Sequence, residues 1–380
     1  MKTSLERATG DSPRGRLLLN ALQWAKRSRV TPEDPKESAT MLKVTATMGA
    51  NVPLREIIPH AKRVESLGYD TLSVAEAVHD GMLSSMAALG ATSTLRVSQG
   101  VLVAFARSPM LAAQGAWDLQ DYSGGRFQLG LGTQVKGNII GRFGMPWSAP
   151  AARLTDYVGA VRACFDTFQN NAPLDFESES YRLNRMQPFF NPGPLECGAP
   201  SILMGAVGPL MTRAVGKVGD ALQTHPTNSE ARYLREVTRP RLEEGTREAG
   251  RNLRIELTAG PMIATGANAK EVEAEMQAAR EALVFTLSTP AYWPALEYHG
   301  WRDVGEKLRQ YTREGKWAEM NDLVTDEILR TFVPAGTYDE IAEILLEEYD
   351  DVAERILFPV PKDPKNDAAS RAVIEKLQGG

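Results

Sequence analysis

The sequence has little of what marks several common protein classes. Its two cysteines, Cys164 and Cys197, form no CxxC or Cys/His cluster, so neither a zinc site nor a disulfide framework is indicated, and a reducing cytoplasm fits. No run of 18 apolar residues is present to span a bilayer, and residues 1–15 lack the apolar core of a signal peptide. The net charge of −5 disfavours polyanions and anionic membranes, so neither nucleic acid nor membrane is expected as a partner.

Several catalytic motifs are missing as well. The chain has no GxSxG nucleophile elbow and no Ser-His-Asp arrangement, which disfavours hydrolysis. It has no HExxH or comparable ligand spacing, so no metal is expected. Gly130 and Gly132 begin a GxG pattern, but Val135 stands where the third glycine of GxGxxG is needed, so a dinucleotide fingerprint is excluded.

What is present is an alternation of short apolar runs with amphipathic helical stretches, starting at Met41. Such alternation predicts a parallel sheet wrapped in helices, and the length of 380 residues suits one barrel with insertions. The predicted strands cover 42–49, 71–77, 96–105, 125–133, 202–205, 220–225, 253–265 and 353–361. The fold class predicted from these runs is α/β, as a (β/α)8 TIM barrel with insertions after strands four and seven.

One domain is predicted, over residues 41–365. Residues 1–40 are polar apart from a helix candidate at 17–26 and read as an N-terminal extension or as a misassigned start. Residues 270–330 are too long for one barrel helix, so they are assigned to helix seven plus an inserted helical excursion. The segment 337–349 is predicted as the last packing helix, and residues 366–380 as a C-terminal tail.

In such a barrel the functional residues follow the carboxyl ends of the strands. That rule selects Glu76 and His79, Thr133, Gln134 and Lys136, Gly205, Ala206, Val207 and Gly208, and His225. GAVG at 205–208 directly precedes a helix, so its N–H groups would face a phosphate; the alternative is an ordinary β-to-α turn. Glu76 and His79 are the predicted acid–base pair, because an imidazole titrates near neutrality and a carboxylate can set its tautomer.

Five segments together resemble the luciferase-like superfamily, and especially its F420-dependent branch. They are GYDTLSVAEAVHD (68–80), FARSPMLAAQGAWDLQDYSGGRF (105–127), SAPAARLTDYVGAVRA (148–163), ILMGAVGPLMTRAVGKVGDAL (202–222) and GTYDEIAEIL (336–345). The resemblance spans most of 41–361. It implies an oxidoreductase that transfers a hydride between a deazaflavin and a small-molecule substrate. An FMN-dependent monooxygenase and a cofactor-binding barrel without turnover remain alternatives.

The resemblance also assigns roles to single residues. It places the strand end at Thr133 under the cofactor ring, gives Arg153 to the cofactor phosphate, and puts a non-prolyl cis peptide at about Gly100-Val101. Lys136 and His225, both selected by the strand-end rule, are predicted to contact the substrate. A solvent-facing arginine and a packing histidine are the alternatives for Arg153 and His225.

Other implications of the resemblance concern the loop after strand four and the oligomer. Lys136 and Arg142 could meet the acidic tail of F420, or could equally be solvated surface charges. Asn138 stands where similar proteins often have histidine, which weakens an acid–base role for this loop, so Gln134 could serve only to orient substrate. A homodimer is the oligomer that the resemblance implies.

Overall fold

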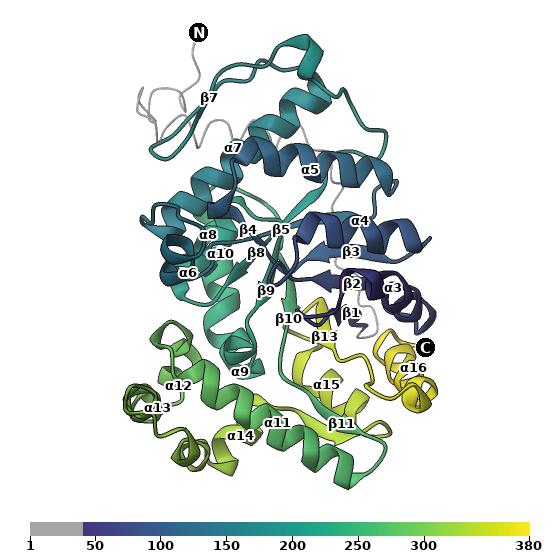
Figure 1. Cartoon of the computed structure of the whole chain (residues 1–380), viewed down its shortest axis with the longest axis vertical. Helices are drawn as coiled ribbons and strands as arrows, with labels where there is room; N and C mark the ends of the chain where they lie inside the picture. The colour runs from purple at the N-terminus through teal and green to yellow at the C-terminus, as the bar shows by residue number, and fades with distance from the viewer. Residues whose placement is uncertain (1–40) are drawn as a thin grey trace.

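The structure is a computed structural model that describes residues 41–380; the predicted N-terminal extension and its helix candidate at 17–26 lie outside the described residues. Eight parallel strands form a closed barrel, as predicted (Figure 1). They pair in the order β3-β2-β1-β13-β10-β9-β8-β5, and a pairing between β3 and β5 closes the ring. The strands are β1 (Lys43–Thr47), β2 (Thr71–Val74), β3 (Arg96–Gln99), β5 (Phe127–Gly132), β8 (Ser201–Ala206), β9 (Ala221–Thr224), β10 (Glu256–Ala259) and β13 (Arg355–Phe358).

Helices surround the barrel, and local sequence sets where several of them begin. Asp80 accepts hydrogen bonds from the N–H groups of Met82 (2.9 Å) and Leu83 (3.1 Å), and Ser108 accepts from Leu111 N (3.1 Å) ahead of Pro109. The barrel helices are α3 (Ile57–Ser66), α4 (Gly81–Ala91), α5 (Pro109–Tyr122), α7 (Pro150–Asn170), α8 (Pro209–Val218), α10 (Arg239–Glu248), α15 (Ile341–Tyr349) and α16 (Asp367–Leu377). None of the helices within residues 41–380 combines the length and apolarity needed to cross a membrane.

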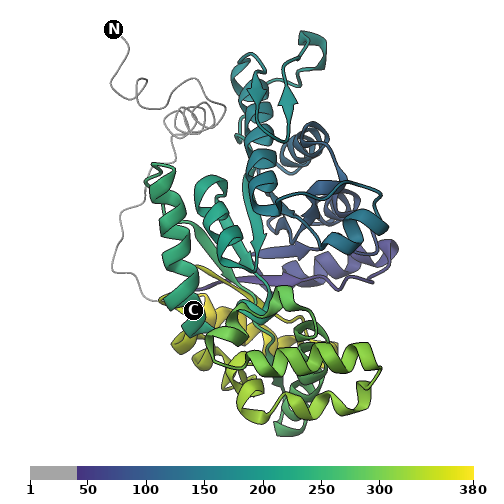
Figure 2. The same cartoon turned by 90° about the vertical axis from the view of Figure 1, so that its left-hand side faces the viewer.

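The insertion after strand seven is a group of helices with a core of its own. We call residues 267–334 the helical lobe; it contains α11 (Ala269–Leu287), α12 (Pro294–Tyr298), α13 (Arg302–Glu314) and α14 (Asp326–Phe332). Figure 2 shows it in green beneath the barrel. Its buried apolar side chains, Leu283, Leu308 and Phe332 among them, form a cluster separate from the barrel core. Two short parallel strands, β11 (Ala264–Gly266) and β12 (Ala335–Thr337), pair where the chain enters and leaves it.

Three boundaries differ from those predicted. The strand expected at 253–265 is two strands, because the chain leaves the barrel after β10, at a Gly260-Pro261 pair, and β11 pairs with β12. Residues 366–380 are not a tail: α16 buries Ile374 and Leu377, and Leu42 N donates to Leu377 O (2.8 Å). The helix expected at 337–349 is therefore not the last, since α15 precedes β13 and α16 follows it.

The insertion before β8 contains more structure than was predicted. A hairpin of β6 (Phe176–Glu177) and β7 (Arg182–Leu183) follows α7 and precedes a Pro/Gly-rich stretch at 189–201. In Figure 1 this hairpin projects at the top of the molecule. It extends the barrel on the side of β5 and β8, away from the helical lobe.

Candidate active site

A cavity of about 1190 Å3 opens at the carboxyl ends of the barrel strands. Ten of the predicted site residues line it: Gly100, Val101, Thr133, Gln134, Lys136, Gly205, Ala206, Val207, Gly208 and His225. They come from the ends of different strands, so the closed barrel, rather than proximity in sequence, brings them together.

Close backbone approach shapes the middle of the cavity. Val101 follows β3, and its side chain packs against two glycines on neighbouring strands. A Cβ atom built on Gly132 would lie 2.3 Å from Val101 Cγ2, and one on Gly205 would lie 3.3 Å from Val101 Cγ1. Only glycine at Gly132 leaves room for this valine, so these residues form a smooth surface of backbone and methyl groups that suits a flat ring. The Gly100-Val101 peptide bond is cis, as the resemblance implied.

Polar side chains lie beside this surface. Ser73 Oγ lies 3.3 Å from Gln223 Oε1, and both side chains sit against Gly100, where a Cβ would be 2.2 Å from Ser73 Oγ. Gln223 lines the cavity and was not predicted, because a glutamine within a strand carries no distinguishing sequence signal. Its amide supplies hydrogen-bonding groups to the edge of a ring placed over Val101.

The positive end of α8 opens into the cavity beside β8. Gly208 is the N-cap residue of α8 without a side-chain cap, and a Cβ there would meet nothing within 4 Å. Because Pro209 occupies the first turn, the next N–H groups, of Leu210 and Met211, have no acceptor within the helix. Asn228 Nδ2 donates to Val207 O (3.1 Å) and fixes this turn. The site can therefore receive an anion such as a phosphate.

Lys136 lies close to this helix N-terminus in the barrel order, because it follows β5, and β5 pairs with β8. Within residues 41–380 it has no ion-pair partner, so its charge is available to a ligand. We call Gly132, Lys136 and Gly205–Gly208, with the first turn of α8, the glycine end of the cavity.

The loop after β5 turns sharply at Gln134, which has a φ of 59°. Its Oε1 accepts hydrogen bonds from Val135 N (2.9 Å) and Asn138 Nδ2 (3.2 Å), and Thr133 Oγ1 donates to Gln134 O (3.0 Å). These bonds hold the loop in a shape that non-glycine residues adopt rarely. The hydrogen-bonding groups of Gln134 Oε1 and the Asn138 amide are therefore used to stabilise the loop itself. Asn138 has no acid–base role there.

His225 follows β9 and is partly buried at the cavity wall. Its imidazole stacks on Tyr292 of the helical lobe, with ring centroids 4.2 Å apart and planes inclined by 19°. Burial lowers the pKa of His225 from 6.5 to about 4, so the ring is neutral at neutral pH. Nδ1 accepts a hydrogen bond from Thr227 N (3.3 Å) and lies 2.8 Å from Thr227 Oγ1, so this nitrogen is engaged within the loop. With the ring proton on Nε2, His225 can act as a hydrogen-bond donor.

Arg153 does not line the cavity. Its Nε donates to the Tyr181 hydroxyl (3.1 Å), one terminal nitrogen donates to Pro146 O (2.6 Å), and its guanidinium lies 4.2 Å from the Phe105 ring centroid. Phe105 in turn contacts Trp147, which does line the cavity. Arg153 therefore lies behind the glycine end, and its predicted grip on a phosphate stays a prediction.

Glu76 and His79 are also outside the cavity lining. Glu76 binds Arg107 through both carboxylate oxygens (2.5 and 2.7 Å) and accepts from Val103 N (2.8 Å). Arg107 also binds Asp80 (2.6 Å), so this cluster fastens the segment after the cis peptide to the end of β2. Glu76 is therefore engaged by Arg107 and Val103 N, and neither Glu76 nor His79 is among the residues that line the cavity, so the acid–base role predicted for this pair stays a prediction.

The opposite side of the cavity was not predicted. Its lining includes Ala278, Ala279 and Ala282 of α11, with Ala291 beyond, and residues 357–361, which cover the end of β13 and the segment after it. We call this the alanine end. His60, which lies within α3, also reaches the lining. Alanine in an amphipathic helix indicates only a good helix former, so this wall could not be predicted from the residue pattern.

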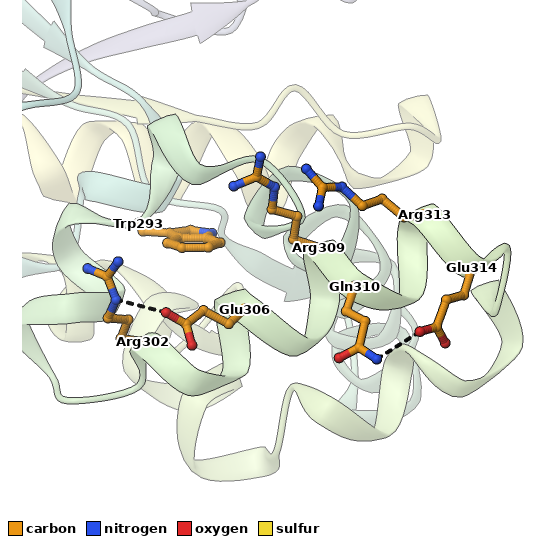
Figure 3. A pocket seen from close by; sticks show the side chains of 7 residues that line it. All are labelled: Trp293, Arg302, Glu306, Arg309, Gln310, Arg313 and Glu314. Atoms are coloured by element: carbon orange, nitrogen blue, oxygen red, sulfur yellow. Dashed lines mark hydrogen bonds and ion pairs between the residues drawn. The ribbon is translucent and has the colours of Figure 1, made fainter.

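A second, smaller hollow of about 320 Å3 lies on the outer surface of the helical lobe (Figure 3). It is lined by Trp293 and by charged or polar side chains of α13. Arg302 is bonded to Glu306 (3.0 Å) and Gln310 to Glu314 (2.7 Å), as expected on a solvated helix face. No cluster of three metal-ligating side chains occurs within the described part of the chain, here or in the barrel.

Comparisons with known proteins agree with this architecture. The family model described as luciferase-like monooxygenase matches residues 38–355. An uncharacterized protein of Mycobacterium tuberculosis is 41% identical over 298 residues, which cover 78% of this chain and 87% of that protein. The 5,10-methylenetetrahydromethanopterin reductase of Archaeoglobus fulgidus is 26% identical over 304 residues, covering 77% and 85%. The structure of the coenzyme F420-dependent tetrahydromethanopterin reductase from Methanopyrus kandleri matches in fold, with a TM-score of 0.73, 19% identity and coverage of 88% and 98%.

Proposed function

We propose, since the chain belongs to the luciferase-like monooxygenase family, that this oxidoreductase uses coenzyme F420 to transfer a hydride to or from a small organic substrate. The observation that carries the proposal is the glycine end, where an uncapped helix N-terminus and an unpaired lysine lie beside a smooth surface of glycine and valine. F420 is proposed first because the chain is similar to a 5,10-methylenetetrahydromethanopterin reductase and shares its fold with a reductase described as coenzyme F420-dependent.

The residues present fit a flat, phosphorylated cofactor. Gly132 and Gly205 leave space that a Cβ would fill, and Gly208 faces open space at the start of α8. Val101 would contact the face of the ring, Gln223 its polar edge, and the α8 N-terminus with Lys136 its phosphate. The deazaflavin supplies the hydride chemistry when bound.

The chain's own part in the reaction is orientation and exclusion of water. His225 Nε2 can donate a hydrogen bond to a substrate oxygen, and Tyr292 covers the other face of its ring. A neutral donor of this kind polarises a carbonyl without adding a charge to the cavity. The ion pair between Glu76 and Arg107, with the hydrogen bond from Val103 N to Glu76, holds the segment 101–107 in place.

An FMN-dependent monooxygenase is the second candidate. FMN also has a flat ring and a phosphate, so the glycine end suits it, and the description of the matching family is monooxygenase. No described side chain distinguishes the two cofactors.

Titration of the purified full chain with F420 and with FMN, followed by cofactor fluorescence, tests the proposal. We expect saturable F420 binding and at least tenfold weaker FMN binding. The reverse order would favour the monooxygenase. Binding of F420 without oxidation or reduction of any carbonyl or alcohol in a broad panel would favour a barrel that binds its cofactor without turnover.

A further inference from the structure

The alanine end differs from the glycine end in the charge of its walls. Arg63 is paired with Asp367 (2.6 Å), and Lys362 is paired with Glu275 (2.5 Å). Of the lysines, arginines and acids that line the cavity, only Lys136 has no partner within residues 41–380, and it belongs to the glycine end. An unpaired ligand charge at the alanine end would therefore find no free counter-charge, and burying it would be costly.

Apart from these ion pairs, the walls of the alanine end carry mainly apolar side chains, and those of α11 are short. Ala278 and Ala282 lie four residues apart on α11, so they share one helix face, and both are exposed at the mouth of the cavity. The same lining contains Phe358, the last residue of β13, and Val360, which follows that strand. Apolar walls favour an apolar ligand, and methyl-sized side chains leave width for a bulky one.

The size of the cavity leaves space for two molecules. Pockets for a single small ligand occupy roughly 300–1,000 Å3, whereas this cavity measures about 1190 Å3. If a cofactor occupies the glycine end, the alanine end stays open beside it. His225 follows β9, which lies in the barrel order between β8 of the glycine end and β13 of the alanine end, and it stacks on Tyr292 of the helical lobe.

We propose that the alanine end binds a neutral, bulky apolar molecule, such as a fused-ring ketone, whose oxygen accepts a hydrogen bond from His225. The apolar body lies between α11 and residues 357–361, and the ligand carries no carboxylate or phosphate. This inference rests on the proposed function only in assigning the glycine end to the cofactor. It makes the helical lobe the part of the chain that selects the substrate by size.

Nile red is a suitable probe, because it is a neutral fused-ring ketone that fluoresces strongly in apolar surroundings. We expect saturable binding of Nile red to the full chain, retained when F420 is present at saturating concentration. Ala282→Phe should weaken Nile red binding at least tenfold by filling the mouth. Ala274→Phe is the matched control on the same helix, exposed but outside the cavity lining, and should change binding less than twofold.

Charge selectivity is tested by displacement of Nile red with two naphthalenes that differ in one group. We expect 2-acetylnaphthalene, a neutral ketone, to displace Nile red at a concentration at least tenfold lower than 2-naphthoate. Equal potency, or equal effects of Ala282→Phe and Ala274→Phe, would overturn the inference, as would complete loss of Nile red binding when F420 is added.

The outcomes separate this inference from the proposed function. Titration of both variants with F420 reports the glycine end alone, and unchanged F420 affinity shows that each variant is folded. If the chain fails to bind F420 while Ala282→Phe still blocks Nile red, the cofactor assignment falls and the alanine end stands. If F420 binds normally and Nile red does not bind, the substrate inference fails alone.

Discussion

At the glycine end the cavity wall is backbone, held by strand pairing and by glycines that leave room for Val101. At the alanine end the wall is a row of small side chains on an inserted helix, supported by a separate core. A backbone wall cannot be altered by one substitution without disturbing the barrel, whereas a wall of alanines can be reshaped one methyl group at a time. We infer that the first suits a fixed cofactor and the second a variable substrate.

The largest effect should come from filling the space beside Val101. In Gly132→Ala the new Cβ would lie 2.3 Å from Val101 Cγ2, and overpacking of this kind costs about 1–3 kcal/mol. We expect a lower melting temperature and about a 100-fold loss of cofactor affinity, at the upper end of that cost. The double variant Val101→Ala/Gly132→Ala should recover much of both, measured as a double-mutant cycle. A single variant that binds like the wild type would show that this wall is not rigid.

Gly208→Asp should separate helix stability from anion binding. Aspartate is a favoured N-cap, so the melting temperature should hold or rise, while its charge should weaken binding of a phosphorylated cofactor about tenfold. Gly208→Asn caps the helix without the charge and is the control. Equal cofactor affinities in the two variants would contradict the assignment of the cofactor phosphate to the N-terminus of α8.

A pair of lysines compares the two ends directly. Lys136→Met should weaken cofactor binding about threefold, since exposed charge interactions contribute roughly 0.2–1 kcal/mol, and added salt should narrow the difference. Lys362→Met should leave cofactor affinity unchanged, because Lys362 is paired with Glu275 away from the glycine end. If both variants lose the same cofactor affinity, the inference that only the glycine end offers a free positive charge is wrong.

Arg153→Ala should have a smaller effect on the cofactor. Because its guanidinium is bonded to Pro146 and Tyr181 and lies over Phe105, its loss should lower the melting temperature and change affinity about twofold. An affinity loss as large as that of Gly208→Asp would place Arg153 on the cofactor phosphate after all, as the sequence resemblance implied.

The last prediction concerns His225 and pH. Its pKa falls from 6.5 to about 4 on burial, so the unfolded chain takes up a proton over this range that the folded chain does not. Stability from this group is therefore complete above pH 6.5 and is lost as the pH falls toward 4. His225→Gln should shrink the difference in melting temperature between pH 7 and pH 5. Burial also lowers the pKa of His60. Because His60 is present in the wild type and in the variant, part of the difference in melting temperature should remain. If the melting-temperature difference between pH 7 and pH 5 were unchanged in His225→Gln, burial would not lower the pKa of His225.

The sequence predicted the barrel well because strand periodicity and strand ends are local features. The run 202–205 differs from β8 by one residue at each end, and the residues that follow β5, β8 and β9 do line the cavity. The split of the run 253–265 into β10 and β11 was missed, since only pairing with the distant β12 separates the two. Polar residues after β2 matched the rule for strand ends, yet Glu76 is taken up by Arg107, a partner 31 residues away.

The alanine end could not be predicted for a related reason. Ala278, Ala279 and Ala282 satisfy the pattern of any helix, and only the placement of the helical lobe over the barrel gives them a function. His60 shows the same limit, because its position within α3 indicates nothing about the cavity beside it.

The pairing of β11 with β12 has a consequence for how this protein can change. Ala264 stands opposite Ala335 and Gly266 opposite Thr337, so the chain departs and returns at one point after an excursion of many residues. A short linker could bridge that point without moving β10 or β13. Exchange of the whole segment between relatives is thus open to evolution and to the engineer, and would import a new selectivity onto an unchanged redox scaffold.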